Sequence, residues 1–198
     1  MKKGLMDGYV GVKFETERVD DPIPAGVSAL VRRMVQAGQH LAMHGMAPLN
    51  GGNMSVRLGE GFVVTASGSN LGVIEPDELV YVDGFEVDAG LVRYRGLELP
   101  SSEAIMHGLV LQARPEAAAV VHAHDPAVTR EAMVRAGLVI TDREEPYGTV
   151  ALAERALEAF ERAEDIIVLE NHGYVCAGPS LEAVIDRIVM THLRLASG

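Results

Sequence analysis

The feature that most constrains this chain is a short apolar segment, AVVHAHDP at residues 119–126, which carries His122 and His124. Small and β-branched apolar residues precede the histidines, and this composition is typical of a buried strand. Alternate side chains of a strand lie on one face, so both imidazoles point the same way. Two neutral imidazoles on one face provide half of a metal site, although histidines at a strand end can equally be held by hydrogen bonds.

A third candidate ligand is His172, in the segment ENHGYVCAG at residues 170–178. It follows an expected buried strand and precedes Gly173, where a tight turn can direct its side chain inward. Three histidines with open coordination positions are typical of a Lewis-acid metal site and favour zinc. We leave His107 open, because it lies one helical turn after Glu103. We expect the other histidines, in predicted helices, to be solvated or packed: they are His40, His44 and His192.

The segment LPSSEAIMH at residues 99–107 predicts a helix that Ser101 caps and that runs to about Arg114, where Pro115 ends it. Free N–H groups at the start of such a helix favour an anion, so Ser101 and Ser102 are either capping residues or anion ligands. Glu103 would lie in the first turn. Its carboxylate either interacts with the helix dipole or acts as a general base beside a metal.

Two further loops are rich in Gly, Ser and Asn: GGNMSVR at residues 51–57 and TASGSN at residues 65–70. Such loops are ordinary turn sequences. They can also form a nest of backbone N–H groups and side-chain donors that holds a phosphate. Neither loop matches the Walker-type phosphate loop, so each is weak evidence by itself.

Strands and helices are mixed along the chain, and many successive strands have no helix between them, which favours a layered sheet with much antiparallel pairing. We predict a single domain over 1–198, with a strand-like N-terminal extension at 1–22. Expected strands are 9–19, 54–58, 62–67, 79–83, a hairpin within 86–94, 118–124, 138–141, 165–170 and 174–178. Expected helices are 25–46, 101–114, 126–136, 149–164 and 180–196.

Composition restricts the possible partners and compartment. The net charge of −11 over 198 residues argues against nucleic-acid binding and against a basic membrane-binding surface. The single cysteine, Cys176, excludes an internal disulfide framework and suits a reducing cytosol, so we expect a cytoplasmic protein. No apolar run is long enough to span a bilayer, and the N-terminus lacks the apolar core of a signal peptide.

Taken in order, GGNMSVR, TASGSN with EPDELVYVD, LPSSEAIMH, AVVHAH and ENHG resemble the class II aldolase/adducin family, in its fuculose-1-phosphate aldolase branch. The resemblance covers about residues 28–192. It implies an α/β/α sandwich around a mainly antiparallel sheet, and homotetramers with active sites at subunit interfaces. It assigns zinc to His122, His124 and His172 and the acid/base role to Glu103. It assigns the substrate phosphate to these residues: Asn53, Ser67, Gly68, Ser101 and Ser102.

The implied reaction is reversible cleavage of a small ketose 1-phosphate to dihydroxyacetone phosphate and an aldehyde. Zinc would bind the carbonyl and an adjacent hydroxyl, and Glu103 would move the proton at the nucleophilic carbon. Rival hypotheses are a methylthioribulose-1-phosphate dehydratase, a pentulose-phosphate epimerase and a non-catalytic adducin-like module. Epimerases of the family usually carry aspartate at the position of Glu103, and adducin-like modules typically lose the metal ligands. Family aldolases use a tyrosine for the aldehyde half, and Tyr147 is the one candidate between His124 and His172.

Overall fold

The computed structural model describes residues 12–197, and these contain nine strands that form one sheet. The first five strands are β1 (Glu15–Arg18), β2 (Asn53–Leu58), β3 (Gly61–Thr65), β4 (Leu79–Glu86) and β5 (Leu91–Arg95). The last four are β6 (Ala119–Ala123), β7 (Val139–Ile140), β8 (Ile166–Leu169) and β9 (Gly173–Gly178). The strands lie in the order β1-β5-β4-β3-β2-β6-β9-β8-β7.

The sheet is mixed but mainly antiparallel. Only the two outermost pairs, β1 with β5 and β7 with β8, are parallel within the described part of the chain. The six inner pairings are antiparallel, including β2 with β6 and β6 with β9. This arrangement confirms the predicted sheet, and it puts the histidine-bearing strand β6 next to the central strand β2.

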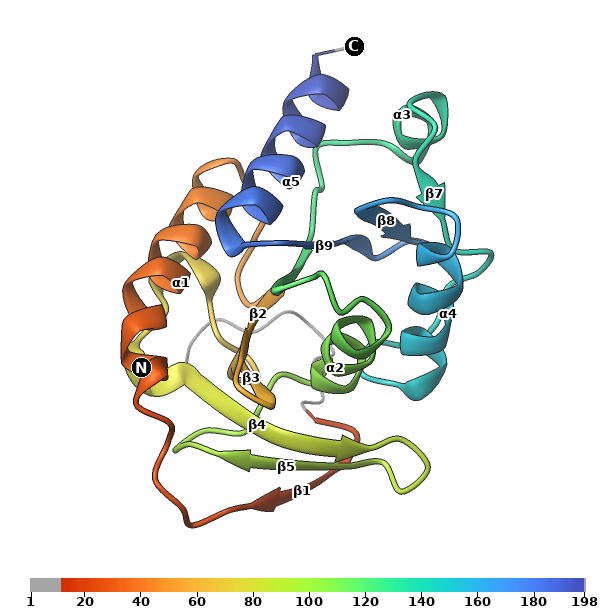
Figure 1. Cartoon of the computed structure of the whole chain (residues 1–198). Coiled ribbons are helices and arrows are strands. Elements are labelled where there is room, and N and C mark those ends of the chain that lie inside the picture. The colour runs from red at the N-terminus through yellow and green to blue at the C-terminus, as the bar shows by residue number, and fades with distance from the viewer. Residues whose placement is uncertain (1–11, 198) are drawn as a thin grey trace.

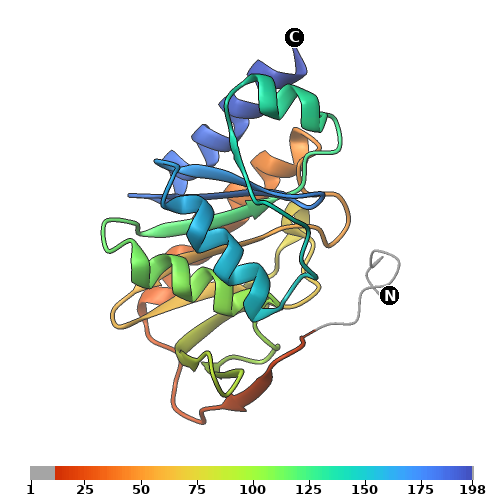
Figure 2. The same cartoon turned by 90° about the vertical axis from the view of Figure 1, so that its right-hand side faces the viewer.

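Helices cover both faces of the sheet and produce the predicted three layers (Figures 1 and 2). One face carries α1 (Gly26–Met43) and α5 (Leu181–Ala196), and the other carries α2 (Ala104–Ala113) and α4 (Val150–Phe160). Shorter helices are α3 (Arg130–Arg135) and the 3₁₀ turns η1 (Leu71–Val73) and η2 (Pro76–Glu78). None of the helices within residues 12–197 is long and apolar enough to cross a membrane.

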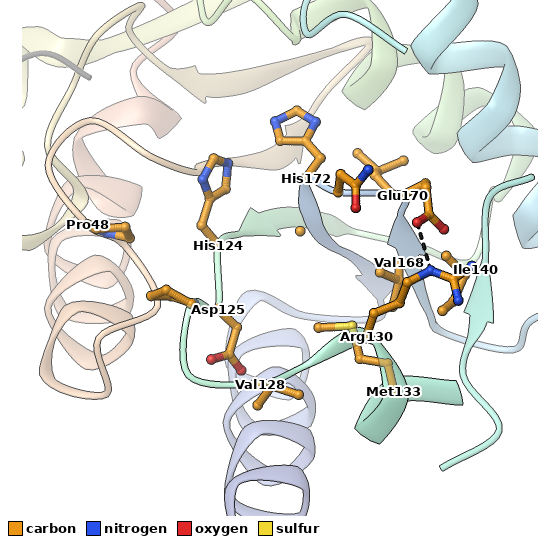
Figure 3. A pocket seen from close by; sticks show the side chains of 14 residues that line it. Pro48, His124, Asp125, Val128, Arg130, Met133, Ile140, Val168, Glu170 and His172 are labelled. Atoms are coloured by element: carbon orange, nitrogen blue, oxygen red, sulfur yellow. Dashed lines mark hydrogen bonds and ion pairs between the residues drawn. The ribbon is translucent and has the colours of Figure 1, made fainter. Parts of the chain in front are cut away.

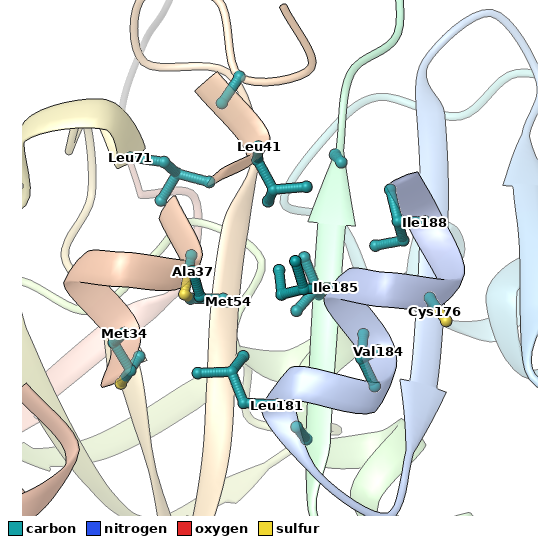
Figure 4. Packing of buried hydrophobic residues seen from close by; sticks show 14 of the residues in the cluster. Met34, Ala37, Leu41, Met54, Leu71, Cys176, Leu181, Val184, Ile185 and Ile188 are labelled. Atoms are coloured by element: carbon teal, nitrogen blue, oxygen red, sulfur yellow. The ribbon is translucent and has the colours of Figure 1, made fainter. Parts of the chain in front are cut away.

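Alternation along the central strands divides the apolar side chains between two cores. In β6, Val121 packs toward α1 and α5, whereas Val120 packs toward α2 and α4. Figure 4 shows the first core, where Leu41 of α1 and Ile185 of α5 meet Met54 of β2. Because side chains alternate with a period of two, Asn53 and Ser55 of β2 and His122 of β6 must face α2. The strand pattern therefore sends a row of polar residues to the α2 side.

The N-terminal strand is shorter than predicted. β1 comprises four residues and pairs with β5 at the edge of the sheet, and Phe14 packs against the core on the α2 face. The first part of the predicted strand, residues 9–11, lies outside the described residues. The predicted hairpin is shifted as well, because β4 runs on through Glu86 and the turn falls at Val87–Gly90, where the Gly90 N–H donates to the Val87 carbonyl.

Four helices have an end that differs from the prediction by three residues or more, and one of them is α4, which ends at Phe160 rather than at residue 164. α1 ends early because Gly45 adopts a φ of 73° and the Met46 N–H donates to the Leu41 carbonyl, which closes the helix. α3 begins only at Arg130 because the Thr129 hydroxyl caps it, accepting from the Ala132 N–H. The fourth is α2, which begins at Ala104 and has Glu103, not Ser101, as its N-cap.

The late start of α2 has a tertiary cause. The Ser101 N–H donates to the Thr65 carbonyl, and Pro100 bridges Ala66, so this part of the chain is held extended against the end of β3. A turn must follow before the helix can begin. The Ser101 hydroxyl still accepts a hydrogen bond, from the Glu103 N–H at 3.2 Å.

Candidate functional site

His122, His124 and His172 converge at one end of the central strands. They are the cluster of possible metal ligands among the described residues, and their ligand atoms all lie within 4.8 Å of one another. The Nε2 atoms of His122 and His124 are 2.9 Å apart. The three rings lie with their centroids 4.6–5.1 Å apart in edge-to-face arrangements. The predicted ligand trio is thus brought together, from β6, its end and the turn before β9.

A tight turn aims His172 at the other two histidines. The His172 N–H donates to the Leu169 carbonyl at 3.0 Å, and Asn171 between them has a φ of 56°. Asparagine tolerates this left-handed conformation better than most residues. The chain therefore reverses between β8 and β9 within a few residues, which returns His172 to the end of the sheet.

His122 is oriented by a backbone carbonyl. Its Nδ1 lies 2.8 Å from the Tyr174 carbonyl oxygen on the neighbouring strand β9. A carbonyl oxygen can only accept, so Nδ1 carries the hydrogen and donates it, and the Nε2 lone pair faces the other histidines. This is the usual way in which a metal-binding histidine is fixed in one tautomer.

Burial keeps the two histidines of the HxH pair neutral. It lowers the pKa of His122 well below the usual value, and the neighbouring His172 adds to the effect. Burial, followed by the influence of His122, lowers the pKa of His124 to about 3. Both rings therefore offer lone pairs rather than positive charge near pH 7, which is the state that a metal requires.

Glu103 lies beside this cluster in a position that suits a bound cation. Its side chain is 3% exposed, with Oε2 3.6 Å from His122 Nε2 and Oε1 3.9 Å from His172 Nε2. Because His122 is neutral, the first contact is not an ion pair. Oε1 is buried and has no hydrogen-bond partner among the described residues. A buried carboxylate without a compensating charge is costly, and a metal ion held by the histidines would supply that charge.

The donor set therefore fits zinc. The ligand atoms of the three histidines lie within 4.8 Å of one another, and three imidazoles are a common ligand set for zinc. Glu103 occupies the N-cap position of α2, but its side chain makes no capping hydrogen bond. A helix-dipole interaction needs no such bond, so a role at the cluster is favoured by Oε1, which has no hydrogen-bond partner among the described residues and lies 3.9 Å from His172 Nε2.

Two polar residues near Glu103 lie outside the predicted site: His107, which the sequence leaves open, and Ser55. His107 of α2 is fully buried, and its two ring nitrogens contact Ser55 Oγ at 2.7 Å and Asn53 Oδ1 at 2.5 Å. Asn53 in turn donates from Nδ2 to Glu103 Oε2 at 2.7 Å. The period of two in β2 could have linked Asn53 with Ser55, but only the packing of β2 against α2 identifies their partner.

The loops predicted to hold phosphate lie side by side. The Ser67 N–H donates to the Leu99 carbonyl, and the Ser101 N–H donates to the Thr65 carbonyl, at 2.9 and 3.0 Å. Ser101 and Ser102 are 3% and 7% exposed, and Gly68 has a φ of 76°. The structure thus brings Ser67, Gly68, Ser101 and Ser102 onto two joined loops. Their role toward a phosphate stays a prediction, as does that of Asn53.

A serine outside the predicted set accompanies these loops. The Ser69 N–H donates to the Ala66 carbonyl, which closes the turn that contains Gly68. The Ser69 hydroxyl is buried and has no hydrogen-bond partner within residues 12–197. A buried hydroxyl without a partner costs free energy, so a ligand at this turn would find a donor that is not otherwise used.

A cavity of about 360 Å³ opens next to the histidines (Figure 3). His124 and His172 lie at one end, and Val128 and Met133 lie at the other. Arg130 on its wall is paired with Glu170 at 2.7 Å. The cavity borders the core on the α1 and α5 side, whereas Glu103 lies on the α2 side. The histidines therefore lie between the cavity and the Glu103 carboxylate.

Tyr147 packs within its own chain. Its ring lies under the Lys13 ammonium group, 3.7 Å from the ring centroid, and Lys13 also donates to the Tyr147 carbonyl. The following residue, Gly148, lies against Ser102, because an added Cβ would be 2.8 Å from the Ser102 carbonyl oxygen. A role for Tyr147 in the aldehyde half of an aldol reaction stays a prediction.

Close approach of strands at the cluster depends on Gly173. A Cβ added there would lie 2.4 Å from the Ala123 carbonyl oxygen and 3.1 Å from His122 Cε1. We expect Gly173→Ala to separate β9 from β6, to lower stability by about 1–3 kcal/mol and to weaken zinc binding. Urea unfolding and zinc analysis would measure both effects. Gly84→Ala is the control, because nothing lies within 4 Å of its added Cβ. Wild-type stability of Gly173→Ala would contradict the prediction.

Known proteins similar to this chain include sugar-phosphate aldolases and a dehydratase. A 5-methylthioribulose-1-phosphate/5-deoxyribulose-1-phosphate aldolase from Rhodospirillum rubrum is 29% identical over 186 residues, covering 84% of this chain and 79% of that protein. A methylthioribulose-1-phosphate dehydratase from Methylococcus capsulatus is 35% identical over 112 residues, or 55% of this chain and 51% of that protein. A solved L-fuculose 1-phosphate aldolase superposes with a TM-score of 0.72 at 26% identity, covering 86% of this chain and 84% of the other.

An α/β/α sandwich with three histidines and a buried carboxylate at one end of its sheet defines a domain with a candidate metal centre. The family model for the class II aldolase and adducin N-terminal domain matches residues 32–195. The chain belongs to the class II aldolase and adducin family, as the five ordered motifs predicted.

Proposed function

We propose that this protein is a zinc-dependent aldolase that cleaves a small ketose 1-phosphate to dihydroxyacetone phosphate and an aldehyde. The observation that carries the proposal is the convergence of His122, His124 and His172 on the buried carboxylate of Glu103. The histidines would hold the ion. When bound, zinc would supply Lewis-acid polarisation of the substrate carbonyl.

Glu103 is proposed to handle the proton at carbon 3 of the substrate. In cleavage, the bond between carbons 3 and 4 breaks, the hydroxyl on carbon 4 loses its proton and becomes an aldehyde, and carbon 3 gains a proton. Glu103 delivers that proton, and in the reverse direction it removes it. Oε1 suits this role, because it has no hydrogen-bond partner within residues 12–197, whereas Oε2 already accepts from Asn53. The serine loops would hold the phosphate and so place carbon 3 near the carboxylate.

The names of the relatives describe two reactions, aldol cleavage and dehydration, and both act on phosphorylated sugars. Their names include aldolases acting on methylthioribulose, deoxyribulose and fuculose phosphates, and dehydratases acting on methylthioribulose 1-phosphate. A dehydratase is therefore our second candidate, since it would use the same ligands and carboxylate. An epimerase is disfavoured by glutamate at position 103, and an adducin-like module is disfavoured by the complete histidine trio.

A product assay tests the proposal. Purified protein loaded with zinc would be given L-fuculose 1-phosphate, 5-deoxyribulose 1-phosphate and 5-methylthioribulose 1-phosphate. Release of dihydroxyacetone phosphate from at least one of them is the expected result. Loss of water from the methylthio substrate, with no dihydroxyacetone phosphate from any of the three, would favour the dehydratase and contradict the aldolase.

The phosphate site gives a separate prediction. We expect Ser102→Ala to lower the specificity constant for phosphorylated substrates by roughly tenfold, because one fixed donor is worth about 1–1.5 kcal/mol or more toward an anion. The reaction of the corresponding free sugar should hardly change. Ser28→Ala, at the exposed start of α1, is the control. Equal losses for phosphorylated and free sugars would remove Ser102 from the phosphate site.

We further propose that the protein is a cytoplasmic homotetramer with its sites at subunit interfaces, as the family resemblance implies. Several large apolar side chains are exposed on the single chain, among them Met43, Val73 and Met190, and such side chains suit a subunit interface. Light scattering should give four times the mass of the chain. A monomeric mass would contradict this proposal.

A further inference from the structure

A buried chain of hydrogen bonds connects Glu103 to the interior of the α2 layer. It begins at Ser55 Oγ, which lies 2.7 Å from His107 Nδ1. It continues from His107 Nε2 to Asn53 Oδ1 at 2.5 Å, and from Asn53 Nδ2 to Glu103 Oε2 at 2.7 Å. All four side chains are less than 9% exposed. Water therefore competes little for these contacts.

The chemistry of the chain fixes the position of every proton in it. A carboxylate oxygen can only accept, so the Asn53 amide must turn its NH₂ group to Glu103 and its carbonyl oxygen to His107. That oxygen also only accepts, so His107 must carry hydrogen on Nε2. The Nδ1 lone pair of His107 then accepts from the Ser55 hydroxyl. Each group has one orientation that satisfies its neighbours on both sides.

Regular secondary structure positions the residues of this hydrogen-bonded series, because they lie in β2 and at the start of α2. Asn53 and Ser55 are alternate residues of β2, so they share the face toward α2, and Asn53 pairs with the candidate metal ligand His122 across the sheet. Glu103 and His107 are one helical turn apart, and the His107 N–H donates to the Glu103 carbonyl. A central strand and the first turn of α2 therefore set the distances in the chain.

We propose that His107 is a positioning residue for Glu103, acting through Asn53. The proposal rests on the function proposed above, in which Glu103 moves a proton. By holding the Asn53 amide in one orientation, His107 ties down Glu103 Oε2. The other oxygen, Oε1, is left without a protein partner among the described residues and faces the histidine cluster. The series of hydrogen bonds from Ser55 to Glu103 therefore determines which oxygen of the Glu103 carboxylate receives the proton.

His107 acts in this chain as a neutral donor. Burial lowers its pKa to about 4, although the nearby Glu103 opposes that effect. The ring is therefore uncharged from about pH 5 upward. His107 orients the Asn53 amide through the hydrogen on Nε2 and not through a positive charge. A merely structural buried histidine would have no reason to influence the rate of proton transfer at Glu103.

A spectroscopic experiment tests the chain without any substrate. Protein labelled with ¹⁵N in its histidine rings and loaded with zinc would be studied by long-range ¹H–¹⁵N correlation between pH 6 and pH 8. The expected result is a single Nε2–H tautomer for His107 over the whole range, assigned by its loss in His107→Gln. A predominant Nδ1–H tautomer would overturn the proposal.

A kinetic experiment separates positioning from stability. We expect His107→Leu to slow the maximal rate of proton exchange at carbon 3 of dihydroxyacetone phosphate by about 10²-fold, as for a misplaced catalytic group. The half-saturating concentration and the zinc content should change little. His107→Gln keeps an N–H donor near the position of Nε2 and should recover much of the rate. Equal maximal rates in wild type and His107→Leu would overturn the proposal.

A matched control accounts for the loss of a buried hydrogen bond. Thr191 is 1% exposed and donates to the Arg187 carbonyl within α5, away from the α2 layer. Thr191→Val should lower stability without changing the exchange rate.

Wild-type protein that binds zinc but never exchanges the proton would contradict the proposed function itself. An Nδ1–H tautomer in protein that does exchange would contradict only the role of His107.

Discussion

Replacement of Glu103 by glutamine is expected to slow proton exchange at carbon 3 of dihydroxyacetone phosphate by roughly 10²-fold or more, the scale of general acid–base catalysis. Glutamine has nearly the same shape and can still accept from Asn53 Nδ2, so the fold and the histidine cluster should persist. The side chain can no longer take up a proton. Exchange in deuterated water can be followed by NMR without any aldehyde, so the identity of the aldehyde does not affect the result.

The control for this substitution is Glu182→Gln. Glu182 lies in the first turn of α5, where it has the helix-dipole role that is the simple alternative for Glu103. The Glu182→Gln substitution should leave the rate of proton exchange at carbon 3 unchanged. Near-wild-type exchange in Glu103→Gln would reject the proposed mechanism. If wild-type protein binds zinc but never exchanges this proton, the dehydratase becomes the better hypothesis.

Removal of one histidine ligand is expected to abolish most zinc binding. His122→Ala and His172→Ala each take away one of three protein ligands, so affinity should fall well beyond the roughly 10–100-fold that changes around the ligands cost. Wild-type protein should contain about one zinc ion per chain after dialysis, and the variants far less. Aldol activity should fall to the background in both.

His40→Ala is the matched control for the ligand variants. His40 lies in α1, outside the cluster, and contacts the ring of His44. It should keep full zinc occupancy. The double variant His122→Ala/His124→Ala should contain almost none. A full complement of zinc in the double variant would place the ion at some other site.

The cluster of three histidines could be predicted because its signal is local. The HxH spacing in a strand and the NHG turn are both visible within a few residues, and the structure brings these histidines together. The order of five motifs was informative for a different reason: together they cover most of the chain, and the family match confirms them. Local patterns and long ordered sets are the two kinds of information that one sequence carries well.

What the sequence did not reveal depends on contacts between distant segments. The start of α2 was misplaced because Ser101 is held by Thr65 of β3, a pairing that no helix pattern near Ser101 discloses. The sequence could not settle the role of His107, because its partners, Ser55 and Asn53, lie about fifty residues earlier, on a strand that packs against α2. The role of a buried polar residue follows from its partners, and these are fixed by tertiary packing.

The pairing of Asn53 with His122 across β2 and β6 has a consequence for folding. A slip of one residue in β2 would turn Asn53 and Ser55 into the opposite layer, because successive side chains of a strand alternate between faces. Such a chain could keep much of its secondary structure, yet Glu103 would lose its amide partner. The three candidate zinc ligands, His122, His124 and His172, lie outside β2, so the slipped chain would still contain them. Zinc content after refolding should therefore not distinguish the two registers, whereas the proposed proton exchange at Glu103 should.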